Sequence, residues 1–341
     1  MSAAQKSVRL DALPDAPARY VEPMKCLLVD HLPEGDDWIY EIKFDGFRAI
    51  AVKSEMGIEL LSRNHKDFSQ RYPSLAAAVK GIRCKTAIID GEVVAMDESG
   101  RSSFQLLQSK DIPSTSAPAI FYYLFDLLQL NGKDLTSLPV TKRKVLLEGL
   151  VGKSNNPHLR FSPALPGTAA EIQKEMAGLK LEGIIAKKKN SKYEPGRRSG
   201  AWVKFKWVAE QEFVIGGFTQ PEGSRKHFGA LIVGYYDGGK LRFASKVGTG
   251  FSDRTLESIY KSLHKLKTTT CPFVNLPEPR NVMGRGGITR AEMSRCTWIK
   301  PSAVCQIRFS EWTRDGHLRH PSFLGMREDK PASEVVREIP A

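Results

Sequence analysis

The hexapeptide KFDGFR at residues 43–48 places a lysine at the end of a predicted strand and an arginine just beyond a glycine turn. The preceding run WIYEI (38–42) leans apolar, as is typical of a strand that ends at Lys43. A lysine amine becomes a covalent nucleophile once its pKa is depressed, and an arginine such as Arg48 binds phosphate in a fixed fork. The hexapeptide therefore indicates covalent capture of a nucleotide phosphate, although by itself it fits a lysine in a solvated turn equally well.

The bulk composition limits the class of protein. The chain has 341 residues, of which 41% are hydrophobic and 26% charged, as is typical of a globular protein with two domains. Its formal net charge of +13 predicts a polyanionic partner. Nucleic acid is the main candidate, because phosphate contacts dominate such binding and require clustered lysine and arginine. Nine basic residues against two acidic ones between residues 180 and 206 favour a phosphate-lined surface there.

The cysteines and the apolar runs bear on location. The five cysteines are scattered and include no CxxC pair, which argues against a zinc module and fits a reducing cytoplasm. Residues 1–19 lack the apolar segment of a secretory signal, and no apolar run is long enough to cross a membrane. The sequence therefore predicts a cytoplasmic, nucleoid-associated protein that has no membrane partner and acts as a monomer.

The first 208 residues predict a mixture of strands and helices. Turn-separated apolar runs predict a mixed or antiparallel sheet, in which 87–89 and 93–96 are separate strands, and the apolar run 120–130 predicts a central strand. Pro73 in a first turn and Thr168 as an N-cap mark the starts of two helices. The predicted helices are 72–79, 104–110, 142–150 and 168–179.

The composition changes near Val208-Ala209, where we expect a hinge. Beyond it, short strands alternate with glycine-rich turns, and the turn YDGG (236–239) is a good hairpin signal. One helix is predicted at 252–267, between strands, and a long loop at 272–287. Several short strands with one inserted helix favour a small Greek-key barrel of the OB type.

Three further segments carry charge at the ends of predicted strands. In IDGEV (89–93) two carboxylates flank a glycine, a pattern that an ordinary Asp-Gly turn would also explain. In LEGII (181–185) a glutamate precedes a β-branched run. In WVKFK (202–206) Lys204 and Lys206 alternate with apolar residues, so both lie on one strand face. Two lysines on one face are costly without an anion, so this segment indicates phosphate binding.

In their order along the chain these segments resemble the covalent nucleotidyltransferases, and among them the ATP-dependent DNA ligases of the bacterial end-joining type. The resemblance runs from about Pro23 to Lys330 and includes LSRN (61–64), YLFDL (123–127) and REDK (327–330). It implies an α+β fold, with a nucleotidyltransferase (adenylation) domain of antiparallel or mixed sheets and helices followed by an OB-fold β-barrel. The expected divisions are a 1–20 extension, the 21–208 adenylation domain, the 209–330 OB domain and a 331–341 tail.

The resemblance also implies roles for individual residues. Lys43 would attack the α-phosphate and keep AMP as a phosphoramidate, with neighbouring cations expected to depress its pKa. Glu92 would bind the ribose hydroxyl, and Phe125 would stack on adenine. The implied catalytic residues are Lys43, Lys204, Lys206, Arg327, Asp329 and Lys330. The implied nucleotide-binding residues are Glu41, Ile42, Arg48, Arg63, Glu92, Phe125 and Arg198, and the implied metal ligands are Glu182, Asp45 and Asp90.

The activity that follows from the resemblance is sealing of 3′-hydroxyl/5′-phosphate breaks in duplex DNA with ATP and Mg²⁺ or Mn²⁺. An RNA ligase and a GTP-dependent mRNA capping guanylyltransferase remain alternatives, and a non-enzymatic DNA-binding module is the alternative from another class. An NAD⁺-dependent ligase is disfavoured because the chain has no four-cysteine zinc module. Expected partners are nicked or broken duplex DNA, a DNA-end-binding protein, and a separate polymerase or nuclease.

Overall fold

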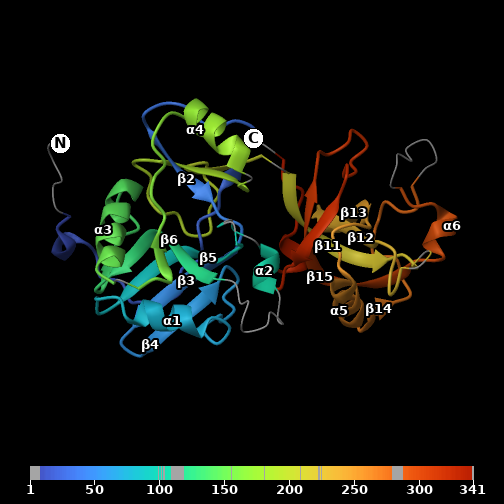
Figure 1. Cartoon of the computed structure of the whole chain (residues 1–341), viewed down its shortest axis with the longest axis horizontal. Coiled ribbons are helices and arrows are strands. Elements are labelled where there is room, and N and C mark those ends of the chain that lie inside the picture. The colour runs from blue at the N-terminus through green and yellow to red at the C-terminus, as the bar shows by residue number, and fades with distance from the viewer. Residues whose placement is uncertain are drawn as a thin grey trace. The chain divides into compact units, whose positions relative to one another are not determined.

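The computed structural model describes two compact units. Unit 1 comprises Met1–Trp207 and unit 2 comprises Val208–Ile339. Figure 1 labels their helices and strands. The described residues are 8–98, 100, 102, 104–108, 119–154, 156–179, 181–207, 209–221, 223, 225–278 and 287–339. Of the sequence predictions, Val208, residues 109–110 of one helix and residues 279–286 of the long loop lie outside this set.

Unit 1 is built on two sheets. The first has the strand order β4-β3-β5-β6-β7, and β8 pairs in parallel with β6. The second has the order β1-β10-β9-β2. The strands of unit 1 are β1 (Leu27–Leu28), β2 (Trp38–Lys43), β3 (Phe47–Ser54), β4 (Gly57–Ser62), β5 (Ala87–Met96), β6 (Ala119–Leu130), β7 (Lys133–Asp134), β8 (Leu159–Phe161), β9 (Gly183–Lys188) and β10 (Trp202–Lys206). Its helices are η1 (Leu10–Ala12), α1 (Pro73–Lys80), α2 (Phe104–Gln108), α3 (Val140–Gly152), α4 (Ala169–Met176) and η3 (Ala177–Leu179).

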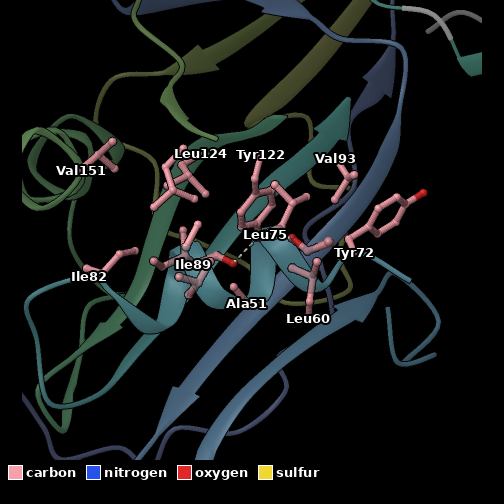
Figure 2. Close-up of a cluster of buried hydrophobic side chains, with 14 of the residues drawn as sticks. Ala51, Leu60, Tyr72, Leu75, Ile82, Ile89, Val93, Tyr122, Leu124 and Val151 are labelled. Atoms are coloured by element: carbon pink, nitrogen blue, oxygen red, sulfur yellow. Dashed lines mark hydrogen bonds between the residues drawn. The ribbon is translucent and has the colours of Figure 1, made fainter. Parts of the chain in front are cut away.

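One face of the first sheet holds the main core of unit 1. Helix α1 packs on β3 and β4, and α3 packs on β6 and β8 (Figure 1). Figure 2 shows the core side chains gathered between the sheet and the helices. Among them, Tyr122 donates its hydroxyl proton across the strands to the carbonyl oxygens of Ala49 at 2.8 Å and Ile89 at 3.1 Å. Because successive residues of a strand face opposite ways, the other face of this sheet is separate from the main core. It carries Arg48 and Asp90 beside a second buried apolar cluster that includes Ile50.

Unit 2 is a curled antiparallel sheet with one long helix. Its strand order is β13-β12-β11-β15-β14, and β16 also pairs with β15. Helix α5 lies between β13 and β14 in sequence and buries Leu256, Ile259 and Leu263 in the barrel core. The elements are β11 (Ala209–Phe218), β12 (Leu231–Asp237), β13 (Lys240–Val247), α5 (Asp253–His264), β14 (Lys267–Thr268), α6 (Arg290–Met293), β15 (Thr297–Phe309), β16 (Ser322–Met326) and η4 (Ala332–Glu334).

Most predicted elements are confirmed. Pro73 opens α1, and Thr168 caps α4 by accepting from the Glu171 backbone N–H. The helix expected at 252–267 ends at His264, and Lys267 lies in strand β14. The prediction of two strands at 87–89 and 93–96 was also wrong, because they are a single strand, β5. The Asp-Gly pair therefore lies inside a ladder rather than in a turn.

The described parts of the predicted extension and of the predicted tail pack on unit 1 and unit 2 respectively. In the predicted extension, Leu10 and Leu13 pack on the unit 1 core, and the Ala16 N–H donates to the Gly132 carbonyl at 2.8 Å. In the predicted tail, Val335 is fully buried in unit 2, and the Tyr236 N–H donates to its carbonyl at 2.7 Å. No helix in the described ranges is long and apolar enough to cross a membrane.

Candidate active site

Strand alternation gives the second sheet of unit 1 one apolar face and one charged face. On the apolar face Tyr40, Ile184, Ala186 and Val203 are buried in a single cluster. The other face carries Glu41 and Lys43 from β2, Lys187 from β9, and Lys204 and Lys206 from β10, because directly paired residues in neighbouring strands project to the same side. The expectation that Lys204 and Lys206 share a strand face is confirmed.

Two lysines flank one glycine at the end of this charged face. Gly183 on the central strand β9 pairs with Lys43 of β2 on one side and with Lys206 of β10 on the other. Glu182 directly precedes Gly183, and its Oε2 lies 2.5 Å from Lys43 Nζ, while its Oε1 lies 4.0 Å from Lys206 Nζ. A Cβ on Gly183 would lie 2.0 Å from the Phe205 carbonyl oxygen, so only glycine allows the strands to approach this closely.

The protonation of Lys43 differs from the expectation. Burial by itself lowers the pKa of an amine, but here the Glu182 carboxylate outweighs it, with smaller contributions from Glu92 and Asp45. The pKa of Lys43 is therefore raised above its usual value rather than depressed. The pairing with Glu182 thus favours the charged form of the amine, whereas attack requires the neutral form.

The glycine of the hexapeptide is also fixed by packing. A Cβ on Gly46 would lie 2.2 Å from the Val93 carbonyl oxygen, so the turn after Lys43 sits directly on β5. In the same turn Asp45 accepts a hydrogen bond from the Phe104 N–H at 3.1 Å, which ties it to the start of α2. This contact positions the turn, and the metal-binding role of Asp45 stays a prediction.

Arg48 faces the charged sheet from β3 and makes hydrogen bonds through all three of its guanidinium nitrogens. Its Nε and Nη2 donate to the two carboxylate oxygens of Asp90 at 2.9 and 2.6 Å, and its Nη1 donates to the Met24 carbonyl at 2.6 Å. Tyr193 also donates to Asp90, at 2.6 Å, and Asp90 is completely buried. Both carboxylate oxygens of Asp90 are thus used within the protein, and its assignment as a metal ligand stays a prediction.

Phe125 lies where the two sheets approach each other. Its ring meets the Trp202 ring edge-on at 6.4 Å, and the Arg48 guanidinium and the Lys187 amine lie 5.4 and 4.7 Å from its centre. Phe125 is only partly buried, so ring surface remains for a ligand. This placement is compatible with the predicted stacking on adenine.

Glu41 is buried beneath the side chains around Phe125 and is not exposed at the surface of the site. Its Oε1 lies 2.8 Å from Lys144 Nζ and 3.0 Å from Lys187 Nζ. The pKa of Lys144 is lowered, chiefly by burial, although Glu41 opposes this shift. Glu41 therefore holds two lysines in place, and any contact with a nucleotide would have to come from its backbone.

The remaining predicted nucleotide ligands are scattered. Glu92 is the strand partner of Arg48 and Tyr123 and lies close enough to act on Lys43. The side chain of Ile42 is on the apolar face, because Ile42 pairs with Ile184. Arg63 accepts a hydrogen bond at its carbonyl from Tyr20, at 2.5 Å. Arg198 is exposed in the loop between β9 and β10.

The C-terminal motif forms its own ion-pair group in unit 2. Arg327 donates to both carboxylate oxygens of Asp329, each at 2.8 Å, and Asp329 is almost completely buried. Lys330 Nζ lies 3.1 Å from Oε2 of Glu212 on β11, and Arg327 lies 3.9 Å from the other oxygen of that carboxylate. Glu212 therefore binds two of the predicted catalytic cations, and no sequence motif marks it.

The other residues that sequence reasoning missed are also partners of motif residues. Tyr193 binds Asp90, Lys144 binds Glu41, and Arg143 binds Asp126 through two bonds of 2.7 and 2.8 Å in a fully buried pair. Tyr193 lies 103 residues from Asp90 in the chain. No spacing rule in the sequence connects such distant pairs.

A metal ion would need more than the protein's own side chains. Within the described ranges, no group of three or more His, Cys, Asp or Glu side chains could hold a metal ion. Mg²⁺ is commonly bound by one or two carboxylates together with substrate phosphates, so it does not require three protein carboxylates. Glu182 lies beside Lys43, and its role as a metal ligand stays a prediction.

Comparisons with known proteins cover most of the chain. Residues 22–206 match the family model described as ATP dependent DNA ligase domain, and residues 224–330 match the ATP dependent DNA ligase C terminal region. The chain is 36% identical over 325 residues to the multifunctional non-homologous end joining protein LigD of Pseudomonas aeruginosa, covering 94% of this chain and 37% of that protein. It is 36% identical over 307 residues to LigD of Mycobacterium bovis, covering 89% of this chain and 38% of that protein.

A solved structure shows the same similarity. Mycobacterial DNA ligase D complexed with ATP and MES has 34% sequence identity and a TM-score of 0.65, and the comparison covers 93% of this chain and 98% of that one. The chain thus spans little more than a third of the full-length curated relatives, 37% and 38%, but nearly all of this structure.

Proposed function

The chain belongs to the ATP-dependent DNA ligases, and we propose that it joins 3′-hydroxyl and 5′-phosphate ends of duplex DNA through AMP held on Lys43. As a member of this family it uses ATP and a divalent metal and forms a covalent AMP intermediate. The observation that supports the residue assignment is the placement of Lys43, Glu182 and Lys206 around Gly183.

The first step transfers AMP to Lys43. The amine forms a bond to the α-phosphorus of ATP, the bond from that phosphorus to the oxygen bridging to the β-phosphate breaks, and pyrophosphate leaves. The amine must also lose a proton, because the Glu182 carboxylate raises the pKa of Lys43. The Glu182 carboxylate stabilises the charged amine, so the proton passes to solvent once the amine is released from Glu182. A divalent cation, when bound, polarises the phosphate oxygens.

The other residues of the charged face neutralise and position the phosphate. Lys204 and Lys206 come from the strand next to Gly183 and carry positive charge to the phosphate that is being transferred. Such preorganised charge is the main source of catalysis in phosphoryl transfer. Phe125 and Glu92 would hold the adenine and the ribose. In unit 2, Arg327, Asp329 and Lys330 would orient the leaving pyrophosphate.

Two further transfers complete sealing. The DNA 5′-phosphate takes AMP from Lys43, and the adjacent 3′-hydroxyl then displaces AMP and closes the strand. Two curated relatives are named for non-homologous end joining, which supports double-strand-break ends as the substrate. A DNA-end-binding protein and a separate polymerase or nuclease would be the partners of such a reaction.

Intact-mass measurement of the protein tests the first step. After incubation with Mg²⁺ and ATP we expect one AMP adduct, which is absent in Lys43→Ala and retained in Lys80→Ala, an exposed lysine at the end of α1. GTP and NAD⁺ should give no adduct. A GMP adduct would instead support a capping guanylyltransferase, and no adduct from any donor would contradict the enzyme assignment. Protein purified already adenylated is recognised by the same mass shift before ATP is added.

A further inference from the structure

A row of partly exposed aromatic rings begins at the residue next to Lys43. The Phe44 ring stacks on the Tyr123 ring with centroids 4.0 Å apart and 29° between the planes. Phe121 meets Tyr123 edge-on at 6.3 Å, and the guanidinium of Arg160 lies 5.1 Å from the Phe121 ring centre. The four residues come from the turn after β2, from β6 and from β8, and we call them the aromatic row.

Core packing does not account for the aromatic row. Phe44, Phe121 and Tyr123 are each partly exposed and belong to none of the hydrophobic core clusters found in the described residues. On β6 the alternate residues Tyr122 and Leu124 point into the core, as Figure 2 shows, so Phe121 and Tyr123 point away from it.

The row lies on the same side of the sheet as the active-site residues. Tyr123 pairs with Glu92, which pairs in turn with Arg48, so these three side chains share one face. At one end Phe44 directly follows Lys43 in the chain, and at the other end Arg160 is exposed. Arg160 pairs with Tyr123 across the β6–β8 ladder, which keeps the guanidinium beside the rings.

The chemistry of the row fits a nucleic-acid strand. Aromatic side chains stack on bases of any sequence, and an arginine at the end of the row can bind a phosphate through its planar fork. The chain has a formal net charge of +13, which favours a polyanion such as DNA as the partner of this surface. The row ends at Phe44, next to Lys43. It would therefore hold the DNA strand whose 5′-phosphate has to reach the AMP on that lysine.

We propose that Phe44, Tyr123, Phe121 and Arg160 form a binding surface for the nucleotides next to the DNA end that is being joined, with the rings stacking on bases or sugars and Arg160 binding a phosphate. This inference rests on the proposed function and deepens it. The row acts in DNA binding and in the two DNA-dependent steps, whereas formation of the lysyl-AMP does not require it.

The far end of the row is the best place for a test, because Phe121 and Arg160 can be changed while the Phe44–Tyr123 stack stays intact. The variants are Phe121→Ala, Phe121→Trp and Arg160→Ala, with Arg83→Ala as a matched control, since Arg83 is also an exposed arginine of unit 1. Each protein is assayed for AMP adduct formation by intact mass, for affinity to a 5′-phosphorylated nicked duplex without ATP, and for sealing of pre-adenylated nicked DNA.

We expect adduct formation within about twofold of the unchanged protein in every variant. Phe121→Ala should weaken nicked-DNA binding about tenfold, in line with the contribution of one stacked base, and slow sealing similarly. Phe121→Trp should restore both. Arg160→Ala should weaken binding and also reduce the slope of log affinity against log salt by about one, whereas Phe121→Ala leaves that slope unchanged. Arg83→Ala should match the unchanged protein.

Several results would overturn the inference. Unchanged DNA affinity and sealing in Phe121→Ala and Arg160→Ala would show that the row binds no nucleic acid. Equal losses of adduct formation and sealing would show that it merely supports the fold, as would failure of Phe121→Trp to restore binding. The proposed function fails separately, when the unchanged protein itself forms no AMP adduct.

Discussion

The proposed catalytic cations are held in different ways in the two units. In unit 1 Lys43 and Lys206 share Glu182, which directly precedes β9 of the same sheet and lies 2.5 Å from the Lys43 amine. In unit 2 Arg327 is held by Asp329 from its own motif, and Lys330 by Glu212 from the distant strand β11. The acid in unit 1 raises the pKa of the proposed nucleophile, whereas the acids in unit 2 hold the cations of the proposed pyrophosphate site.

The surroundings of the two groups differ as well. Beneath the unit 1 site lie carboxylates that are almost completely buried, and each of them binds a cation: Glu41, Asp90 and Asp126. In unit 2 the side chains of Arg327, Lys330 and Glu212 keep 11%, 13% and 12% of their surface exposed. Partly hydrated pairs are easier to separate than buried ones, because desolvation dominates the cost of breaking a pair. The cations of the unit 1 site are themselves no less exposed, since Lys43 keeps 20% of its side-chain surface and Arg48 18%. The comparison therefore predicts that the buried carboxylates beneath the unit 1 site are its rigid part.

The largest effect is expected from breaking a buried pair. Asp126→Asn leaves the Arg143 charge buried and poorly compensated, which should lower the free energy of unfolding by about 3–5 kcal/mol. Thermal unfolding of the purified protein measures this loss. Asp15→Asn breaks a pair whose carboxylate is 88% exposed and should cost less than about 1 kcal/mol. Equal losses in the two variants would contradict the idea of a fixed, buried support.

The next effect separates the two units by reaction step. Arg327→Ala should slow AMP adduct formation about 100-fold or more but leave sealing of pre-adenylated nicked DNA nearly unchanged, because pyrophosphate leaves only in the first step. Lys206→Ala should slow both by a similar factor, because in the proposed mechanism Lys206 neutralises the transferred phosphate in every step. Single-turnover assays of each step test this. Sealing that is lost equally in both variants would rule out the division of labour.

A smaller effect is expected at Glu212. Glu212→Gln removes the charge that holds Lys330, so adduct formation should fall about tenfold, comparable with the loss of a charged hydrogen bond. Sealing of pre-adenylated DNA should not change. Glu334→Gln, an exposed acid close behind the motif, serves as the control. An increase in adduct formation would mean that Glu212 competes with the triphosphate for Lys330 instead of positioning it.

The smallest effect is a shift in pH dependence. Because Glu182 raises the pKa of Lys43, the reactive neutral amine is scarce near neutral pH, and its fraction increases about tenfold per pH unit below the pKa. Single-turnover adduct formation should therefore rise with pH through the alkaline range. In Glu182→Gln the charge that raises the pKa is gone, so the profile should level off at lower pH, even if the maximal rate falls. A flat profile in the unchanged protein would show that nucleotide binding frees the amine from Glu182.

Much of the fold could be predicted because local signals were strong. Pro73 and Thr168 mark helix starts by backbone chemistry that acts within one turn, and the apolar run 120–130 corresponds to β6. The pair Asp90-Gly91 led to the wrong prediction of a turn, because the same two residues also occur within strands. Gly91 is inside β5, where a Cβ would lie 2.5 Å from the Tyr122 ring. That contact comes from another strand and leaves no trace in the local sequence.

For the site, the sequence by itself determined which residue types stand at the strand ends. Alternation alone was enough to place Lys204 and Lys206 on one face. The tertiary structure decided which charge meets which: Lys43 with Glu182, Arg48 with Asp90, and Lys330 with Glu212. The physical reason is that Coulomb and desolvation energies depend on distances of a few ångströms, which are set by strand register between segments more than 100 residues apart in some pairs. The protonation of Lys43 is therefore a property of the folded protein and not of its motif.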